Sequence, residues 1–194
     1  MTLKTPPAIP ERPERDLSAA IETERLRLRM FRPDDLDNLA GMLADPDVMR
    51  YVEDGQPKDR EVADKALHSI IAHWGRHGFG RWAVEDKASG EFVGFGGLRS
   101  LFGTPEVVYH LARPHWGKGY ATELGRASLQ YGFRDHGFDR IVAIVKPGND
   151  ASIHVLEKLG LRFEMRTSYY DMEVVQYSIM ADQWAADPES KYLL

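Results

Sequence analysis

Cysteine is absent from this chain of 194 residues, which excludes disulfides, thiolate metal ligands and cysteine nucleophiles. Long hydrophobic runs are absent too, and none reaches the length of a membrane-spanning helix. The N-terminal segment has no apolar core of the kind that a secretory signal peptide needs. We therefore expect a cytoplasmic protein that does not act at a membrane.

An excess of positive charge is also missing, because 25 lysines and arginines face 30 aspartates and glutamates, a net charge of −5. General affinity for nucleic acid requires a basic face, so direct nucleic-acid binding is not expected. Apolar residues make up 43% of the chain, an ordinary share for a globular protein. The length suits one domain with a sizeable core.

The chain is predicted to have one domain between two tails. Residues 1–20 contain four prolines among charged residues and are expected to form a mobile N-terminal tail. Residues 21–184 carry the hydrophobic patterns of a single domain, without an internal repeat or a linker. Residues 185–194 are expected to be a C-terminal tail.

Hydrophobic periodicity predicts a mixed α+β domain of about six to seven strands and about four helices. The predicted strands are 25–30, 82–84, 92–95, 107–112, 141–145, 161–169 and 173–180, and the predicted helices begin near 34, 60, 120 and 150. Arg25, Arg27 and Arg29 alternate with apolar residues in the first strand and are expected to form its solvent-facing side.

The segment 107–133 dominates the functional analysis. Its strand ends before Pro114, and the helix that follows is entered through Gly117-Lys118-Gly119. A glycine-rich turn into a helix leaves several backbone N–H groups free, and the helix dipole adds positive potential there. Such a turn suits phosphate or pyrophosphate, although the same turn also occurs as a plain connection that binds nothing.

Two common phosphate-binding motifs do not fit this turn. A P-loop requires G-x-x-x-x-G-K-[ST], which the chain lacks. A dinucleotide fingerprint requires G-x-G-x-x-G/A, and here Thr122 occupies the third place. Asp139, the acidic residue at the distance expected for ribose binding, precedes the next strand instead of following it. Neither motif is therefore predicted.

The run Trp116-Gly117-Lys118-Gly119-Tyr120-Ala121 resembles the Q/R-x-x-G-x-G/A signature with which GNAT acetyltransferases bind acyl-CoA. The longer run Trp-Gly-Lys-Gly-Tyr-Ala-Thr-Glu is similar to the form in the RimJ/RimL branch, which acetylates protein N-termini and some small amines. Trp116 departs from the Gln or Arg of the signature, but the contacts concerned are main-chain ones. The resemblance implies that the CoA pyrophosphate is bound by backbone N–H groups of Trp116, Gly117, Lys118, Gly119, Tyr120, Ala121 and Thr122.

A second segment extends the resemblance. Asn149, Ser152, Leu156 and Gly160 occupy the places of a family pattern that has Asn, a small residue, Tyr and Gly. The tyrosine that many GNAT enzymes use as a general acid is therefore missing, and a serine at the Ser152 place is thought to take that role in the RimJ/RimL branch. The resemblance implies that Asn149 and Ser152 lie at the cofactor and that Ser152 protonates the leaving thiolate. From the residues alone, both are good helix caps.

The resemblance also implies the arrangement of the sheet. A GNAT fold has a mixed, mostly antiparallel sheet that splays between its fourth and fifth strands, here the strands at 106–112 and 140–145. The pantetheine arm of acetyl-CoA lies in the gap and pairs with free backbone groups of the first of these strands. Tyr109, His110 and Leu111 are the positions expected to make that pairing.

Acetyl transfer to an amine requires that the amine lose its proton, because an ammonium has no lone pair. Glu106 is the first candidate for the base and His110 the second, since both lie on one face of an ideal strand. A solvated strand end is an equally good interpretation of Glu106, and a hydrogen-bonded core histidine is the better interpretation of His110. No side chain is needed if water carries the proton, or if the acceptor is an α-amine near its own pKa.

The expected partners are acetyl-CoA and an amine acceptor, either a protein N-terminus or a small amine. The residues expected to line the acceptor pocket are Tyr51, Glu53, Asp54, Trp74 and Phe79. A monomer or a homodimer is expected. A CoA-binding regulatory module that has lost catalysis is the main alternative, and a nucleotide-binding protein is another.

No metal is expected. His73 and His77 lie four residues apart on a predicted helix. Two histidines without a third ligand are more often surface residues than a zinc site.

Overall fold

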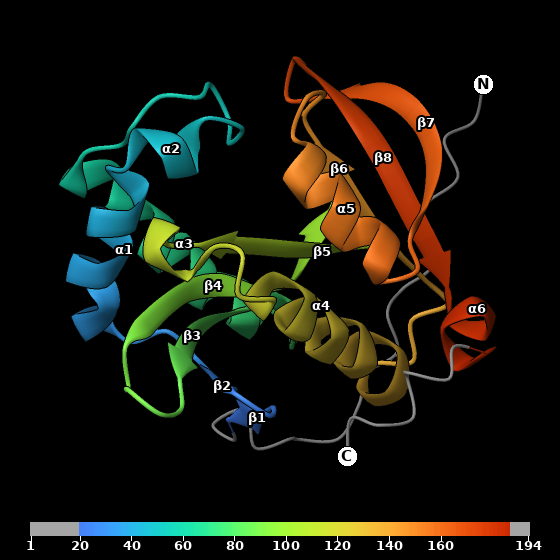
Figure 1. Cartoon of the computed structure of the whole chain (residues 1–194), viewed down its shortest axis with the longest axis horizontal. Helices are drawn as coiled ribbons and strands as arrows, with labels where there is room; N and C mark the ends of the chain where they lie inside the picture. The colour runs from blue at the N-terminus through green and yellow to red at the C-terminus, as the bar shows by residue number, and fades with distance from the viewer. Residues whose placement is uncertain (1–19, 187–194) are drawn as a thin grey trace.

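The computed structural model describes residues 20–186, which form one eight-stranded sheet with helices packed against it (Figure 1). The strands are β1 (Ile21–Glu22), β2 (Leu26–Arg29), β3 (Arg81–Asp86), β4 (Phe92–Leu101), β5 (Thr104–Leu111), β6 (Arg140–Val145), β7 (Arg162–Tyr169) and β8 (Met172–Met180). Their order in the sheet is β1-β2-β3-β4-β5-β6-β8-β7, and only β5 and β6 pair in parallel. The predicted mixed α+β fold is confirmed, and the strand beyond the expected number is the two-residue β1.

Six α-helices accompany the sheet in the described part of the chain. They are α1 (Leu36–Leu43), α2 (Pro46–Met49), α3 (Arg60–His77), α4 (Tyr120–Gln130), α5 (Asp150–Lys158) and α6 (Ala181–Ala186). Helices α2 and α6 were not predicted, because four and six residues are too few to show a helical period. Helix α3 begins where the Asp59 carboxylate accepts a hydrogen bond from the Val62 N–H, and it ends at Gly78, whose φ is +70°.

The two expected tails fall mostly outside the described residues, at 1–19 and 187–194. Residues 185 and 186 belong to α6, so the last helix continues past the expected domain boundary. Within residues 20–186, no helix combines the length and the apolar character that crossing a membrane requires.

Helices pack closely against both faces of the central strands. On one face, Leu124 of α4 lies beside Gly96 of β4, where an added Cβ would lie 2.7 Å from the leucine side chain. On the other face, Phe95 of β4 belongs to a buried cluster with Leu39 of α1 and Ile70 of α3. The missing side chain at Gly96 allows α4, and the turn at its N-terminus, to approach the sheet.

Strands β5 and β6 diverge after a single pairing position, Glu106 opposite Val142. Within the described chain, residues 107–111 of β5 therefore pair with β4 on one edge and with no strand on the other. In Figure 1, β5 runs toward the side of α1 and α2, whereas β6 lies beside α5. The expected splay is present, and it leaves backbone groups of β5 open on one edge.

Candidate active site

A cavity of about 1130 Å³ opens where β5 and β6 diverge. Its wall includes every predicted catalytic and cofactor-binding residue except Lys118. These residues are Glu106, Tyr109, His110, Leu111, Trp116, Gly117, Gly119, Tyr120, Ala121, Thr122, Asn149 and Ser152. The fold thus brings the glycine-rich turn, the open edge of β5 and the start of α5 to one space.

The glycine-rich turn has the geometry of an anion site. Gly117 and Gly119 have φ values of +72° and +81°, a left-handed conformation that favours glycine. Gly119 caps α4 without a side-chain hydrogen bond, so the first N–H groups of the helix, from Tyr120 to Thr122, have no partner within it. These donors and the helix dipole fit a pyrophosphate, and the large cavity extends from them along β5.

Two residues of the turn differ from the expectation. The Trp116 N–H donates to the Arg113 carbonyl at 3.1 Å, and the Trp116 indole N–H donates to the Leu111 carbonyl at 2.8 Å. The expectation of a free Trp116 N–H is therefore wrong, since proline at 114 bends the chain into a short turn that uses it. Lys118 lies outside the cavity wall with its side chain exposed.

Arg25 supports this turn from outside, a role that the sequence analysis missed. Its Nη1 donates to the Lys118 carbonyl at 2.8 Å, and its Nη2 forms a 2.7 Å ion pair with Glu123 in the first turn of α4. The Arg25 guanidinium also lies 4.8 Å from the centre of the Tyr120 ring. The alternating pattern of the first strand predicted only that Arg25 faces solvent. It did not indicate the contacts of Arg25, because its partners are more than 90 residues away in the chain.

Tyr109 and Ser152 connect β5 to α5 across the cavity. The Tyr109 hydroxyl lies 3.0 Å from the Ser152 hydroxyl and 3.1 Å from the Ser152 carbonyl oxygen. Burial raises the pKa of Tyr109 to about 12, although the Ser152 hydrogen bond opposes the shift. Asn149 caps α5 by accepting a 3.3 Å hydrogen bond from the Ser152 N–H, so its capping role is present. The Ser152 hydroxyl is left to face the cavity and Tyr109.

Glu106 and His110, the two candidate bases, lie in different surroundings. Glu106 is only 1% exposed and accepts a 2.5 Å hydrogen bond from Nε of Arg99, so its interpretation as a solvated strand end is wrong. Burial raises the pKa of Glu106, although Arg99 and the Ile144 N–H favour its carboxylate form. Burial, assisted by nearby Arg99 and Arg81, lowers the pKa of His110 to about 3. At neutral pH, His110 is therefore uncharged.

The expected acceptor residues divide into two groups. Tyr51, Glu53 and Asp54 line the cavity, whereas Trp74 and Phe79 are buried in the hydrophobic core and do not line it. The expectation is wrong because Trp74, in the last turn of α3, packs on Trp82 and Tyr131, and Phe79, beyond the helix, packs on Phe138. Earlier members of the apolar stripe of α3, Val62, Ala66 and Ile70, do line the cavity. Two arginines that the sequence analysis did not single out, Arg81 and Arg99, lie in the cavity wall instead.

His73 is buried, not a surface residue. Its Nδ1 lies 2.9 Å from the Phe79 carbonyl oxygen, which can only accept, and its Nε2 accepts a 3.1 Å hydrogen bond from the Ser100 N–H. Both ring nitrogens are therefore occupied, which leaves no lone pair for a metal. No cluster of three or more potential metal ligands is found within residues 20–186.

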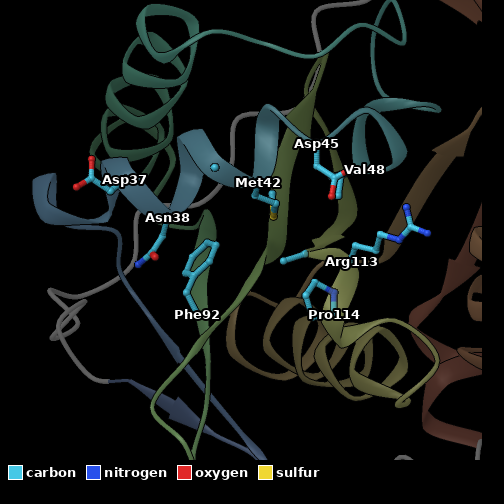
Figure 2. Close-up of a pocket in the computed structure, with 10 residues that line it drawn as sticks. Asp37, Asn38, Met42, Asp45, Val48, Phe92, Arg113 and Pro114 are labelled. Atoms are coloured by element: carbon cyan, nitrogen blue, oxygen red, sulfur yellow. The ribbon is translucent and has the colours of Figure 1, made fainter.

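A second cavity, of about 300 Å³, lies between α1, β4 and the segment 112–114 (Figure 2). Asn38 and Met42 of α1 lie across from Phe92 of β4 and from Pro114 in Figure 2. None of the predicted site residues lines it. The smaller cavity is therefore a separate feature.

Comparisons with known proteins agree with this arrangement. The family model described as an acetyltransferase (GNAT) domain matches residues 25–162. The uncharacterized protein YkkB of Bacillus subtilis is 35% identical over 168 residues, 80% of this chain and 92% of that protein. An uncharacterized N-acetyltransferase, p20 of Bacillus licheniformis, is 30% identical over 84% of this chain and 97% of its own length.

A solved structure shares the same fold. An acetyltransferase from Agrobacterium tumefaciens superposes with a TM-score of 0.75 and 27% identity, covering 87% of this chain and 99% of that one. The family match covers well over half of the chain and includes the glycine-rich turn and the start of α5. The chain therefore belongs to the GNAT family and is an acetyl-CoA-dependent N-acetyltransferase.

Proposed function

We propose that the protein moves an acetyl group from acetyl-CoA to a primary amine by direct attack in a ternary complex. The amine belongs to a protein N-terminus or to a small molecule. The observation that carries this proposal is the Ser152 hydroxyl, which faces the cavity 3.0 Å from the Tyr109 hydroxyl. A proton donor thus stands between the anion-binding turn and the open edge of β5.

Acetyl-CoA, when bound, supplies an activated acetyl group and a thiolate leaving group. The N–H groups of Gly117 to Thr122 bind its pyrophosphate. On the open edge of β5, the backbone of Tyr109 and the Leu111 N–H bind its pantetheine arm, since the Leu111 carbonyl accepts from Trp116 and the His110 backbone faces β4. An N–H of the same strand polarises the thioester oxygen. Ser152 donates its hydroxyl proton to the leaving sulfur and takes the proton of the Tyr109 hydroxyl, and solvent in the cavity returns a proton to the Tyr109 phenolate, whose pKa of about 12 favours the protonated form.

Proton removal from the acceptor is assigned to Glu106. Its raised pKa makes it a stronger base than an ordinary carboxylate, whereas the pKa of about 3 makes His110 a weak one. Glu106 is nearly inaccessible, and a water in the cavity therefore carries the proton between the amine and the carboxylate. His110 stays the second candidate.

The RimJ/RimL branch is the part of the family that we assign to this chain. The Trp-Gly-Lys-Gly-Tyr-Ala-Thr-Glu run at 116–123 and the serine at 152 support the assignment. Both lie in the cavity region with backbone geometry that fits CoA.

The decisive experiment measures thiol release from acetyl-CoA with a panel of free N-terminal peptides, polyamines and aminoglycosides. Turnover with one class, lost in Ser152→Ala, is expected. The alternative, a catalytically silent CoA-binding module, requires calorimetric binding of CoA without turnover of any amine. A nucleotide-binding protein would bind ATP in preference to CoA in the same calorimeter.

A further inference from the structure

Arg81 is a partly buried cation on which Glu106 acts only at a distance, without a hydrogen bond or an ion pair in the described chain. Its Nε is inaccessible to solvent and has no hydrogen-bond partner, and no ion pair is found for its guanidinium within residues 20–186. Burial lowers its pKa to about 10, so the group is still charged at neutral pH. Burying an unpaired charge is costly, and such a group is therefore suited to a ligand that neutralises it.

A second guanidinium lies on the same face of the sheet. Arg81 of β3 lies opposite Gly97 of β4, and Arg99 follows Gly97 by two residues, so both arginines point to one side. Gly97 contributes no side chain between them. Both arginines line the large cavity.

None of the nearby carboxylates forms an ion pair with Arg81 in the described chain. Glu106 is hydrogen-bonded to Arg99 and neutralises one charge. Glu53, which acts on Arg99 at longer range, is already paired with Lys58 at 3.3 Å. Within residues 20–186, Arg81 is therefore the guanidinium of this pair that has no ion pair of its own.

The phosphates of CoA do not account for that charge. Glu106 lies beside the arginines near the start of β5, and the turn that fits pyrophosphate follows the end of β5 at Leu111. Five residues of strand separate Glu106 from Leu111, about 16 Å at 3.3 Å per residue. His110 and Glu106, the two candidate bases, share the arginine face. The positive charge therefore lies at the acceptor end of the cavity.

We propose that the acceptor amine carries a carboxylate, which binds between Arg81 and Arg99 and holds the amine on the face of β5 that carries Glu106 and His110. The inference rests on the proposed acetyl transfer and names the class of acceptor. The guanidinium of Arg81 pairs with the carboxylate through charge-assisted hydrogen bonds. The carboxylate is either the α-carboxylate of a free amino acid or an acidic side chain at a peptide N-terminus.

The test compares matched acceptors that differ only in this charge. One arm pairs free methionine with methioninamide, and the other pairs a tripeptide that begins with Asp with one that begins with Asn. Rates are referred to the concentration of free amine, because the members of a pair differ in amine pKa. In at least one arm, kcat/KM for the carboxylate member is expected to be about ten- to a hundred-fold higher.

Arg81→Gln is expected to abolish this preference and to leave the affinity for acetyl-CoA unchanged. Arg27→Gln, which removes an exposed arginine from β2, is the matched control and should keep the preference. If Arg81→Gln does not fold, an inhibition experiment on the wild-type enzyme takes the place of the variant. The inhibitor is an acid, namely the preferred acceptor without its amino group, which keeps the carboxylate but cannot be acetylated. The acid should compete with the acceptor far better than its amide does.

Three results would overturn the inference. They are equal kcat/KM values in both arms, a preference that survives in Arg81→Gln, and equal inhibition by the acid and its amide. Each leaves the proposed acetyl transfer intact if neutral amines are acetylated in a Ser152-dependent way. Absence of turnover with every amine, despite binding of acetyl-CoA, would overturn the proposed function together with the inference.

Discussion

The hydroxyl of Tyr109 lies 3.0 Å from the hydroxyl of Ser152, and the two side chains join strand β5 to helix α5. The helix itself has Leu156 where related enzymes carry a tyrosine, and Leu156 is 1% exposed in the core. Here a phenol, that of Tyr109, reaches Ser152 from strand β5. If Ser152 is the proton donor that we propose, Tyr109 is the hydroxyl from which it can take a second proton.

We predict that Ser152→Ala lowers kcat by roughly ten- to a thousand-fold and leaves the affinity for acetyl-CoA within a few-fold. Tyr109→Phe should give a smaller loss, because Ser152 keeps its own proton. Single-turnover kinetics isolate the chemical step from product release. A normal single-turnover rate in Ser152→Ala would rule out the proton-donor role.

Gly119→Val is expected to weaken CoA binding at least about ten-fold, because valine is strained at positive φ and relief of that strain would move the N–H groups of the turn. An added Cβ would also lie 3.3 Å from the Arg25 guanidinium, which supports the turn. Gly78→Val is the matched control, since Gly78 has a φ of +70° and lies outside the cavity wall. Calorimetry with CoA makes the comparison. Equal affinities in the two variants would contradict the assignment of the turn.

Arg25 should act on the turn without touching the acceptor. Arg25→Gln removes the hydrogen bond to the Lys118 carbonyl and the ion pair with Glu123, so KM for acetyl-CoA should rise about three- to ten-fold with kcat nearly unchanged. Arg27→Gln, two residues along the same strand face, should leave both parameters unaltered. A fall in kcat without a change in KM would show that Arg25 does not position the turn.

The sequence predicted those parts of the site that depend on local pattern. The turn at 117–119, the strand before it and the Asn149 cap each follow from neighbouring residues, because glycine at positive φ and helix caps are local requirements. The mixed sheet and its splay followed from the order of the elements and from the family resemblance.

The parts that were missed depend on distant contacts. Arg25 meets Lys118 across 93 residues, and Tyr109 meets Ser152 across 43. Arg81 and Arg99 come together only through the β3–β4 register, and a single sequence specifies register weakly. Trp74 has the periodicity expected of α3, but periodicity does not tell whether a buried face meets the core or a cavity.

We predict that the folded protein loses stability on mild acidification because of His73. Burial lowers its pKa from 6.5 to about 4, although the hydrogen bond to the Phe79 carbonyl opposes the shift. Because the folded pKa is depressed, the stabilisation from neutral His73 is complete above pH 6.5 and is lost as the pH falls toward 4. The loss is on the order of 2–3 kcal/mol.

His73→Gln tests this titration, because an amide can donate to Phe79 and accept from Ser100 without titrating. The variant should be less stable than the wild type at pH 7, and the difference should shrink between pH 6.5 and pH 4. Urea unfolding at several pH values measures it. A difference that stays constant over this range would exclude His73 as the titrating group.

Glu106→Gln keeps the size and most of the hydrogen bonding of Glu106 but removes its proton affinity. If Glu106 receives the proton of the acceptor, activity at neutral pH should fall by about ten- to a thousand-fold. In the plot of kcat/KM against pH, the fall in activity on the acidic side, the acidic limb, should also disappear in this variant. That limb lies above 4.5, the ordinary carboxyl value, because burial raises the pKa of Glu106. Activity should recover in part at high pH, where the free amine is abundant without a base.

Two variants separate a base from a structural ion-pair partner. Glu53→Gln removes another carboxylate from the cavity wall and should leave the acidic limb in place. Arg99→Gln leaves Glu106 without its closest cation, and the pKa of the carboxyl should rise further, moving the limb to higher pH. A structural role would lower activity in both Glu106→Gln and Arg99→Gln without moving any limb. In that case His110→Ala becomes the variant whose profile identifies the base.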